Sequence, residues 1–194
     1  FGARALKGQA GATLMLEPKA LAAALDALSL RLQLDDPALP ALQLALQGAA
    51  TLTPQRAAGR LQGTVNEQRV DANFDAQLAR VRPFVDLQAD IATLDLNRFA
   101  TPAQRAAAPA PAGAAMPVNL QPLRALDGRL RLNVARLLRP PYRIDGLALQ
   151  ARIDNGRLEV QRLAGRAWGG SFDASGSADA ANQGLALRLR AQDV

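Results

Sequence analysis

Carboxylates are the main acid–base groups available to this chain of 194 residues, which contains neither cysteine nor histidine. Without those two residue types there are no disulfides, thiolate nucleophiles, histidine general bases or Cys/His zinc sites. Paired carboxylates can supply general acid–base catalysis when a cleft or burial shifts the pKa of one member. The closest pairs in the sequence are Asp35 with Asp36, Asp71 with Asp75, and Asp86 with Asp90.

The residues around the last two pairs favour a solvated position over a catalytic one. Both pairs occupy polar positions of segments that alternate apolar and polar residues, where charges face water. A weak, open cation site at Asp71, Asn73 and Asp75 is the alternative, since alternate strand residues present their oxygens on one face. No nucleophile–base pair stands beside them, so we predict a protein that is not an enzyme and holds neither metal nor cofactor.

Arginine dominates the charge of the chain. There are 23 basic and 17 acidic residues, giving a formal net charge of +6, and all basic residues except Lys7 and Lys19 are arginine. This balance fits an anionic membrane surface, a nucleic acid, or the Arg- and Ala-rich composition of a GC-rich genome. The arginines are spread along the chain and only 4% of residues are aromatic, which disfavours nucleic acid as a partner.

Alternation of apolar and polar residues is the strongest structural signal. From Leu28 to Leu34 every even residue is leucine and every odd one is polar, which in a β-strand places the leucines on one face. At least nine such segments predict strands. Besides 28–34, they include 42–46, 61–65, 70–78, 85–91, 130–134, 147–153, 158–160 and 185–189.

Short turn signals separate these segments. Asn155-Gly156 is the clearest, because both residue types tolerate positive φ in a two-residue hairpin turn. The predicted fold is therefore mostly β, within the α+β class. We expect a curved antiparallel sheet that forms a groove or a half-open sandwich, with one or two short helices.

Helical signals are few. The segment 18–27 begins with a proline, is rich in alanine and has leucines at helical spacing, so it predicts one helix. Shorter helical turns are expected at 97–99, after the cap candidate Asp95, and at 121–125. Between them, residues 101–117 are rich in alanine and proline, lack periodicity and predict a surface linker.

The linker divides the chain into two β-rich units. The first is expected over residues 1–100, including the helix near 18–27, and the second over 118–194, continuous with the sheet of the first. The segment Leu52–Arg60 matches Leu158–Arg166 in Leu, Gln, Arg, Ala, Gly and Arg at a spacing of 106 residues. The second unit is therefore interpreted as a repeat of the first.

Targeting and membrane signals are missing from the sequence. No stretch reaches the ~18–20 consecutive apolar residues of a transmembrane helix, and the first residues lack the regions of a signal peptide. The chain also begins with Phe1 rather than methionine. We expect it to be a piece of a longer protein that carries its anchor elsewhere.

A glycine pair marks the C-terminal unit. Gly169-Gly170 lies between Trp168 and Phe172, and no helix is expected after it, which is not typical of a phosphate-binding loop. The pair predicts a bulge or sharp bend inside a strand, with Trp168 and Phe172 on the same face as core or groove packing. A specific ligand contact by Trp168 is the alternative.

Several motifs of the C-terminal half resemble those of the AsmA family. They are the run Leu126–Leu132, the Asn155-Gly156 hairpin with its flanking alternation, and the strand Leu163–Gly176 that carries the glycine pair. The segment Leu94–Phe99 also resembles a short Asp-Leu-Asp-Arg-Tyr element of that family, with Asn and Phe substituted. The resemblance covers residues 80–194 and reaches the first 80 only through the style of their strands.

The resemblance implies a large envelope protein of Gram-negative bacteria, anchored in the inner membrane by an N-terminal helix outside this chain. Its periplasmic part would be a long, curved β-sheet with an apolar inner groove, associated with outer-membrane assembly and phospholipid transport between membranes. No catalytic residue follows from it. The implied partners are phospholipid or another acyl lipid, the rest of the same protein, and the envelope membranes.

Physical reasoning is compatible with a lipid-binding groove. A diacyl lipid in water exposes about thirty methylenes at ~0.8 kcal/mol each, so its transfer needs a continuous apolar lining. A closed sandwich would bury the same leucines equally well, and the alternative function is a structural or protein-interaction module without lipid. The candidate groove residues are Leu130, Leu132, Val134, Leu147, Leu149, Ile153, Leu158, Val160, Trp168 and Phe172, and the expected structural glycines are Gly156, Gly169, Gly170 and Gly176.

Overall fold

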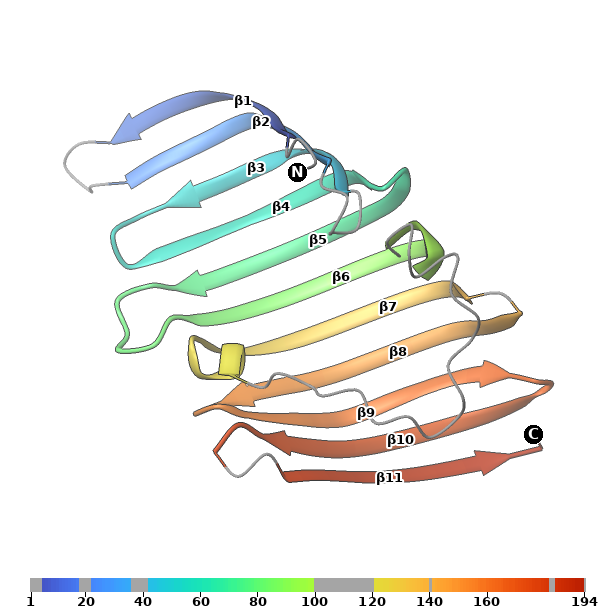
Figure 1. Cartoon of the computed structure of the whole chain (residues 1–194). Coiled ribbons are helices and arrows are strands. Elements are labelled where there is room, and N and C mark those ends of the chain that lie inside the picture. Colours follow the sequence, from blue (N-terminus) through green and yellow to red (C-terminus); the bar gives the residue numbers. More distant parts are fainter. Residues whose placement is uncertain are drawn as a thin grey trace.

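The strands form one open sheet (Figure 1). The computed structural model describes residues 5–17, 22–35, 42–99, 121–139, 141–181 and 184–193. In these residues eleven strands lie side by side in sequence order. Their bounds are β1 (Ala5–Glu17), β2 (Ala22–Asp35), β3 (Leu42–Leu52), β4 (Arg56–Val65), β5 (Gln68–Gln77), β6 (Phe84–Asp95), β7 (Asp127–Arg139), β8 (Tyr142–Asp154), β9 (Arg157–Ala167), β10 (Gly170–Asp179) and β11 (Gly184–Gln192).

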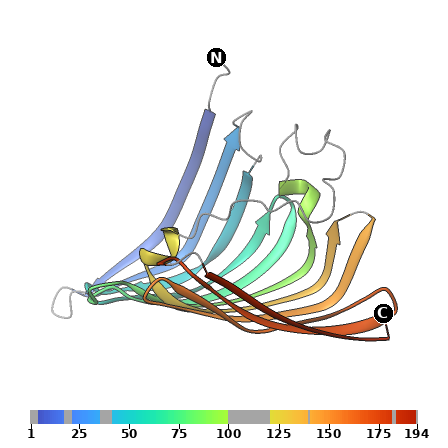
Figure 2. The same cartoon turned by 60° about the horizontal axis from the view of Figure 1, so that its bottom comes forward.

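The sheet is curled rather than flat. Figure 2 shows β1 and β2 rising out of the layer that β7–β11 form. Of the ten neighbouring pairs described, nine are antiparallel and one is parallel. The prediction of a mostly β fold built on a curved antiparallel sheet is therefore confirmed.

Side chains alternate between two faces, as the sequence pattern predicts. In β3 the leucines are half-buried and the residues between them are exposed. We call the side that holds these leucines the apolar face and the opposite side the polar face. One row of the apolar face, followed through the register of neighbouring strands, consists of Leu30, Leu46, Gly63, Val70, Ile91, Val134 and Leu147.

The helix predicted over 18–27 is wrong for residues 22–27, which belong to β2, and the rest of that segment lies outside the described residues. A β-bulge, with a φ of 50° at Ala27, separates Leu25 from Leu28. Its extra residue brings both leucines to the apolar face although they are three positions apart. The bulge explains why the leucines of this strand have a spacing that is typical of a helix. Pairing with β1 and β3 outweighs the helix propensity of alanine.

β6 and β7 are the parallel pair. β6 runs into a 3-10 turn, η1 (Leu96–Phe99), where the Asn97 amide donates a 3.0 Å hydrogen bond to the Asp95 carboxylate. A second 3-10 turn, η2 (Gln121–Arg124), precedes β7, so both predicted helical turns are confirmed. The predicted linker, 101–117, lies outside the described residues. A parallel neighbour requires the chain to return to the end of the sheet where β6 began.

Two hairpin turns connect β8, β9 and β10. Asn155 and Gly156 have φ values of 53° and 80°, which confirms the predicted two-residue turn. Trp168 and Gly169, with φ values of 53° and 88°, form a turn of the same kind between β9 and β10. The prediction of a bulge inside a strand at this point is wrong, because two successive positive φ values end β9 and reverse the chain.

Gly170 and Gly176 allow β10 to approach its neighbour closely. A Cβ on Gly170 would lie 2.3 Å from the carbonyl oxygen of Gln192, and one on Gly176 would lie 2.5 Å from that of Ala186. Both distances are shorter than any van der Waals contact. A side chain at either position would therefore push β11 away from β10.

Both expected units contribute to the same sheet. β3, β4, β5 and β6 begin at 42, 56, 68 and 84, and β8, β9, β10 and β11 begin 100, 101, 102 and 100 residues later. The sequence match has a different spacing, 106 residues. Leu52–Arg60 spans the β3–β4 turn, whereas Leu158–Arg166 lies inside β9, so the match does not align equivalent elements.

Candidate functional site

Nine of the ten predicted groove residues lie together on the apolar face of β7–β10. Antiparallel register places side chains of one face opposite each other in neighbouring strands. The facing pairs are Leu132 with Leu149, Val134 with Leu147, Leu130 with Ala151, Ala151 with Val160, Ile153 with Leu158, and Phe172 with Gly165.

Trp168 does not join them. It lies in the β9–β10 turn with 70% of its surface exposed, and its ring meets that of Tyr142 edge-on, with centroids 6.2 Å apart. The expected sharing of one face by Trp168 and Phe172 is absent, because a turn residue leaves the alternation that Phe172 follows in β10. Trp168 is an aromatic residue at the end of the sheet.

The apolar face is much larger than the predicted site. It continues without a break from β7–β10 into β2–β6 and onto β11, in rows that cross the sheet. The groove residues predicted from the sequence all lie in the C-terminal unit, although the same alternation is present in the first unit. One row consists of Leu28, Gly48, Leu61, Ala72, Ala89, Leu132, Leu149, Leu163, Ala174 and Leu189.

No second layer covers this face within the described residues. Strands have substantial contacts only with their neighbours in the sheet, and η1 and η2 touch only β7 and β9 in this way. Among the described residues, Val134 is the one large side chain that is fully buried, with 1% of its surface exposed. The leucines around it are half-buried, as expected for side chains that touch each other sideways and have no described layer above them.

The polar face holds the carboxylates that the sequence singled out. Asp71 lies opposite Asp90, and Asp75 opposite Asp86, which brings like charges together across β5 and β6. Asp36 and the side chain of Asp35 are outside the described part. Each of these four carboxylates has a polar partner that offsets the repulsion. Asp71 forms an ion pair with Arg69 at 3.5 Å, Asp75 with Arg56, and Asp86 with Arg129 at 3.0 Å. Asp90 accepts a 2.9 Å hydrogen bond from the Asn133 side chain.

These pairings suit exposed ion pairs rather than catalysis. Arg56 Nε donates a 2.9 Å hydrogen bond to Asp75, and this bond holds the pKa of the Asp75 carboxyl below its usual value. The Arg143 guanidinium lowers the pKa of Asp145 in the same way. Carboxyls of lowered pKa stay ionised at neutral pH and make poor general acids. Across the described chain, no three acidic side chains gather in a way that could hold a metal ion.

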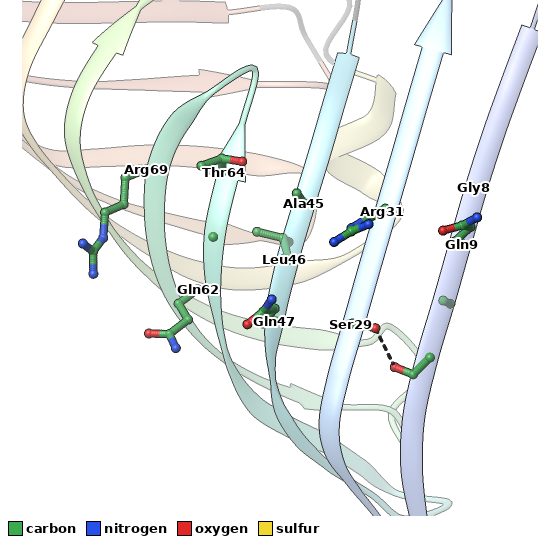
Figure 3. Close-up of a pocket in the computed structure, with 13 residues that line it drawn as sticks. Gly8, Gln9, Ser29, Arg31, Ala45, Leu46, Gln47, Gln62, Thr64 and Arg69 are labelled. Carbon is green, nitrogen blue, oxygen red and sulfur yellow. Dashed lines mark hydrogen bonds between the residues drawn. The ribbon is translucent and has the colours of Figure 1, made fainter.

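A hollow on the polar face, over β1–β5, is drawn in Figure 3. The Ser29 hydroxyl donates a 3.4 Å hydrogen bond to the Gly11 carbonyl at one side of it. Its lining mixes polar and cationic side chains with Ala10, Ala45 and Leu46, so it lacks the continuous apolar surface of the opposite face. The polar side chains along it are Gln9, Ser29, Arg31, Gln47, Gln62, Thr64 and Arg69.

Two buried amides fasten η1 to the sheet. Asn66, in the β4–β5 turn, accepts a 2.7 Å hydrogen bond from the Gln43 amide and donates one of 3.0 Å to the Arg98 carbonyl. Gln68 donates one of 3.3 Å to the Asp95 carbonyl. Both side chains are less than 10% exposed. Nothing in the local sequence marks these two amides, because their carbonyl partners lie 32 and 27 residues further along the chain.

Comparisons with known proteins add no relative. A scan against protein-family models and searches of curated proteins and of solved structures find no match to this chain. Among the described helical segments, none has the length and apolar character needed to cross a bilayer.

Proposed function

We propose that the chain is a non-enzymatic, lipid-binding segment of an AsmA-like envelope protein, and that acyl chains of phospholipid lie against its apolar face. The observation that carries the proposal is the extent of this face. In the row from Leu28 to Leu189, ten successive strands present only leucine, alanine or glycine. Apolar surface of this extent marks an interaction site, since its exposure to water is unfavourable.

The energetics of lipid transfer favour such a surface. A diacyl lipid carries about thirty methylenes, and at ~0.8 kcal/mol each its exposure to water would cost on the order of 24 kcal/mol. A protein that moves the lipid must replace most of the lost apolar contact at every step. Continuous rows of leucine and alanine meet that requirement better than one isolated pocket.

The size of the sheet suits acyl chains. Neighbouring strands lie ~4.8 Å apart, so the ten intervals between β1 and β11 span about 48 Å. A lipid tail spans half of the ~30 Å hydrocarbon core of a bilayer, which is about three strand intervals. The apolar face therefore has room for tails at several positions along the sheet.

The chemistry of the face predicts a class of ligand rather than one compound. Small-molecule pockets combine apolar walls with a few placed polar groups that fix the orientation of the ligand. In the row from Leu28 to Leu189 no such polar group interrupts the leucine, alanine and glycine. We therefore propose that the ligands are acyl lipids in general and that the apolar face does not recognise their headgroups.

The envelope setting is part of the same proposal. Its support is the motif resemblance over residues 80–194 together with the long, curled, one-layered sheet. On this proposal the segment works in the periplasm, within a protein anchored in the inner membrane, in phospholipid transport and outer-membrane assembly. The net charge of +6 suits work beside anionic membrane surfaces.

A structural or protein-interaction module is the second candidate function. It is favoured by one observation: the sheet ends at β1 and β11 in open edges, which can pair with strands of other segments. In that case protein covers the apolar face and no lipid is bound. Recovery of lipid separates the two candidates.

The test is lipid extraction and mass spectrometry of the chain purified without detergent. Phospholipid should accompany the wild-type protein, and Leu149→Asp should remove most of it because a charge then interrupts the apolar row. The matched control is Gln150→Asp, the next residue on the polar face, which should retain the lipid. Absence of lipid from the wild type would overturn the proposal.

Photocrosslinking keeps the test independent of stability. A photoreactive amino acid at position 132 should crosslink to acyl chains, whereas the same group at position 131, on the polar face, should not. Equal crosslinking at both positions would show that contact with lipid is not a property of the apolar face, and would also contradict the proposal.

A further inference from the structure

β11 is one edge of the sheet that the described residues form (Figure 1). All nine of its residues are exposed. Leu185, Leu187 and Leu189 leave 80%, 71% and 64% of their surface in solvent, although they continue the rows of the apolar face. The inner leucines of these rows, such as Leu149, are half-buried because they have neighbours on both sides.

The polar side of β11 carries two exposed arginines, Arg188 and Arg190. Neither forms an ion pair with any described residue. Asp173 lies opposite Arg190 in the register of β10, but its carboxylate is bound by Arg162 at 3.3 Å. The edge therefore combines an apolar row on one side with uncompensated positive charge on the other.

β7 has the same alternation and shows what such a strand pairs with. It reads Arg129-Leu130-Arg131, and β11 reads Arg188-Leu189-Arg190. The neighbouring β6 places Asp86 at 3.0 Å from Arg129 and 4.0 Å from Arg131, while Leu87 and Leu130 face each other on the apolar side. The charge and the apolar row of β7 are both satisfied by one acidic, alternating strand.

We propose that the outer edge of β11 binds an acidic amphipathic β-strand of a partner polypeptide. In the bound register, apolar side chains lie beside Leu187 and Leu189, and a carboxylate lies between Arg188 and Arg190. Backbone hydrogen bonds to the open edge supply affinity, and the alternating side chains select the partner. The carboxylate supplies the selective element because it meets two cations that have no other described partner.

The arginines have another conceivable role, as charges that keep sheet edges of different molecules apart. The two roles predict different responses to charge reversal. Arginines that only repel other edges would leave the binding of an acidic strand unchanged when reversed. Arginines that recognise it would lose the acidic strand and gain a basic one.

The probe is a synthetic peptide with the sequence of residues 84–93, the acidic strand that β7 already accepts, carrying a fluorophore and a polar tail. We expect it to bind the 194-residue chain, measured by fluorescence anisotropy, and to bind more weakly as salt is added. The matched control is the same peptide with Asp86→Lys and Asp90→Lys, which should bind at least about tenfold more weakly.

The second arm reverses the charges on the protein. The variant Arg188→Glu/Arg190→Glu changes only exposed side chains of the edge, and circular dichroism checks that its strand content is unchanged. The affinity of this variant for the acidic peptide should be at least about tenfold lower than that of the wild type. The variant should bind the lysine peptide instead. That exchange of preference is what a merely structural role of the arginines would not produce.

Three results would overturn the proposal: no binding of the acidic peptide, binding that is indifferent to charge reversal, or a wild-type chain that dimerises through β11 and thereby excludes the peptide. Analytical ultracentrifugation of the wild type and the double variant decides the last of these. Lipid binding by the apolar face is measured separately, so failure of the edge proposal leaves the proposed function unaffected.

Discussion

The two faces of the sheet are made by the same strands and are held together by different kinds of contact. On the apolar face Leu132 and Leu149 meet within a row in which leucine, alanine and glycine alternate freely between strands. On the polar face Asp86 requires a particular partner, Arg129 at 3.0 Å. Apolar contact is non-directional, so composition is enough to build it, whereas a charge needs an opposite charge at a defined position.

The difference appears most clearly at β7. Val134, on the apolar face, is 1% exposed, and its neighbour Ala135 is exposed on the other side. One residue along the chain thus separates the most enclosed large side chain of the described part from open solvent. Substitutions at adjacent positions are therefore the direct way to test the assignment of the two faces.

The largest effect is expected at that position. Val134→Asp places an unpaired carboxylate between Ile91 and Leu147 and should cost about 3–5 kcal/mol of unfolding free energy. Ala135→Asp, the matched control, should change it by no more than about 0.5 kcal/mol. Urea denaturation followed by circular dichroism measures both. Similar losses from the two variants would mean that the faces are not distinct here.

An intermediate effect is expected for the two aromatic residues of the glycine-pair region. Phe172→Ala removes a half-buried ring from the apolar face and should destabilise the protein by about 2 kcal/mol. Trp168→Ala removes an exposed ring with one aromatic neighbour and should cost less than about 1 kcal/mol. Thermal denaturation of both variants shows which substitution destabilises the protein more. A larger loss at Trp168 would place that residue on the apolar face after all.

The smallest effect concerns the polar face. The hydrogen bond from Arg56 lowers the pKa of Asp75, so the ionised carboxylate is favoured by folding. Its contribution to stability is present above the pKa that aspartate has in the unfolded chain, and it is lost as the pH falls through the lower pKa of the folded state. Both side chains are open to solvent, so the change in stability should be slight.

An NMR titration of the carboxyl carbons measures this pairing directly. In Arg56→Gln the pKa of Asp75 should rise towards the ordinary aspartate value, and that of Asp145, which is held low by Arg143, should stay where it is. An unchanged pKa of Asp75 in the variant would show that the ion pair is not formed in solution.

The sequence by itself determined which residues share a face. Period-2 alternation is a local property, because successive side chains of a strand point to opposite sides whatever the strand pairs with. This is why most of the strands, the Asn155-Gly156 turn and the common face of nine of the ten groove candidates could be assigned from the sequence. The same locality explains the 3-10 turn η1, since the cap at Asp95 lies two residues from the amide it binds.

Tertiary structure decided how those strands are joined. The parallel pairing of β6 with β7, the bulge that turns residues 22–27 into strand, and the partners of Asn66 depend on residues far away along the chain. Trp168 shows the same limit, because it lies in the turn between β9 and β10. Alternation assigns each side chain to a face but not to a neighbour. The neighbours depend on register and connection, which are fixed only when the whole sheet forms.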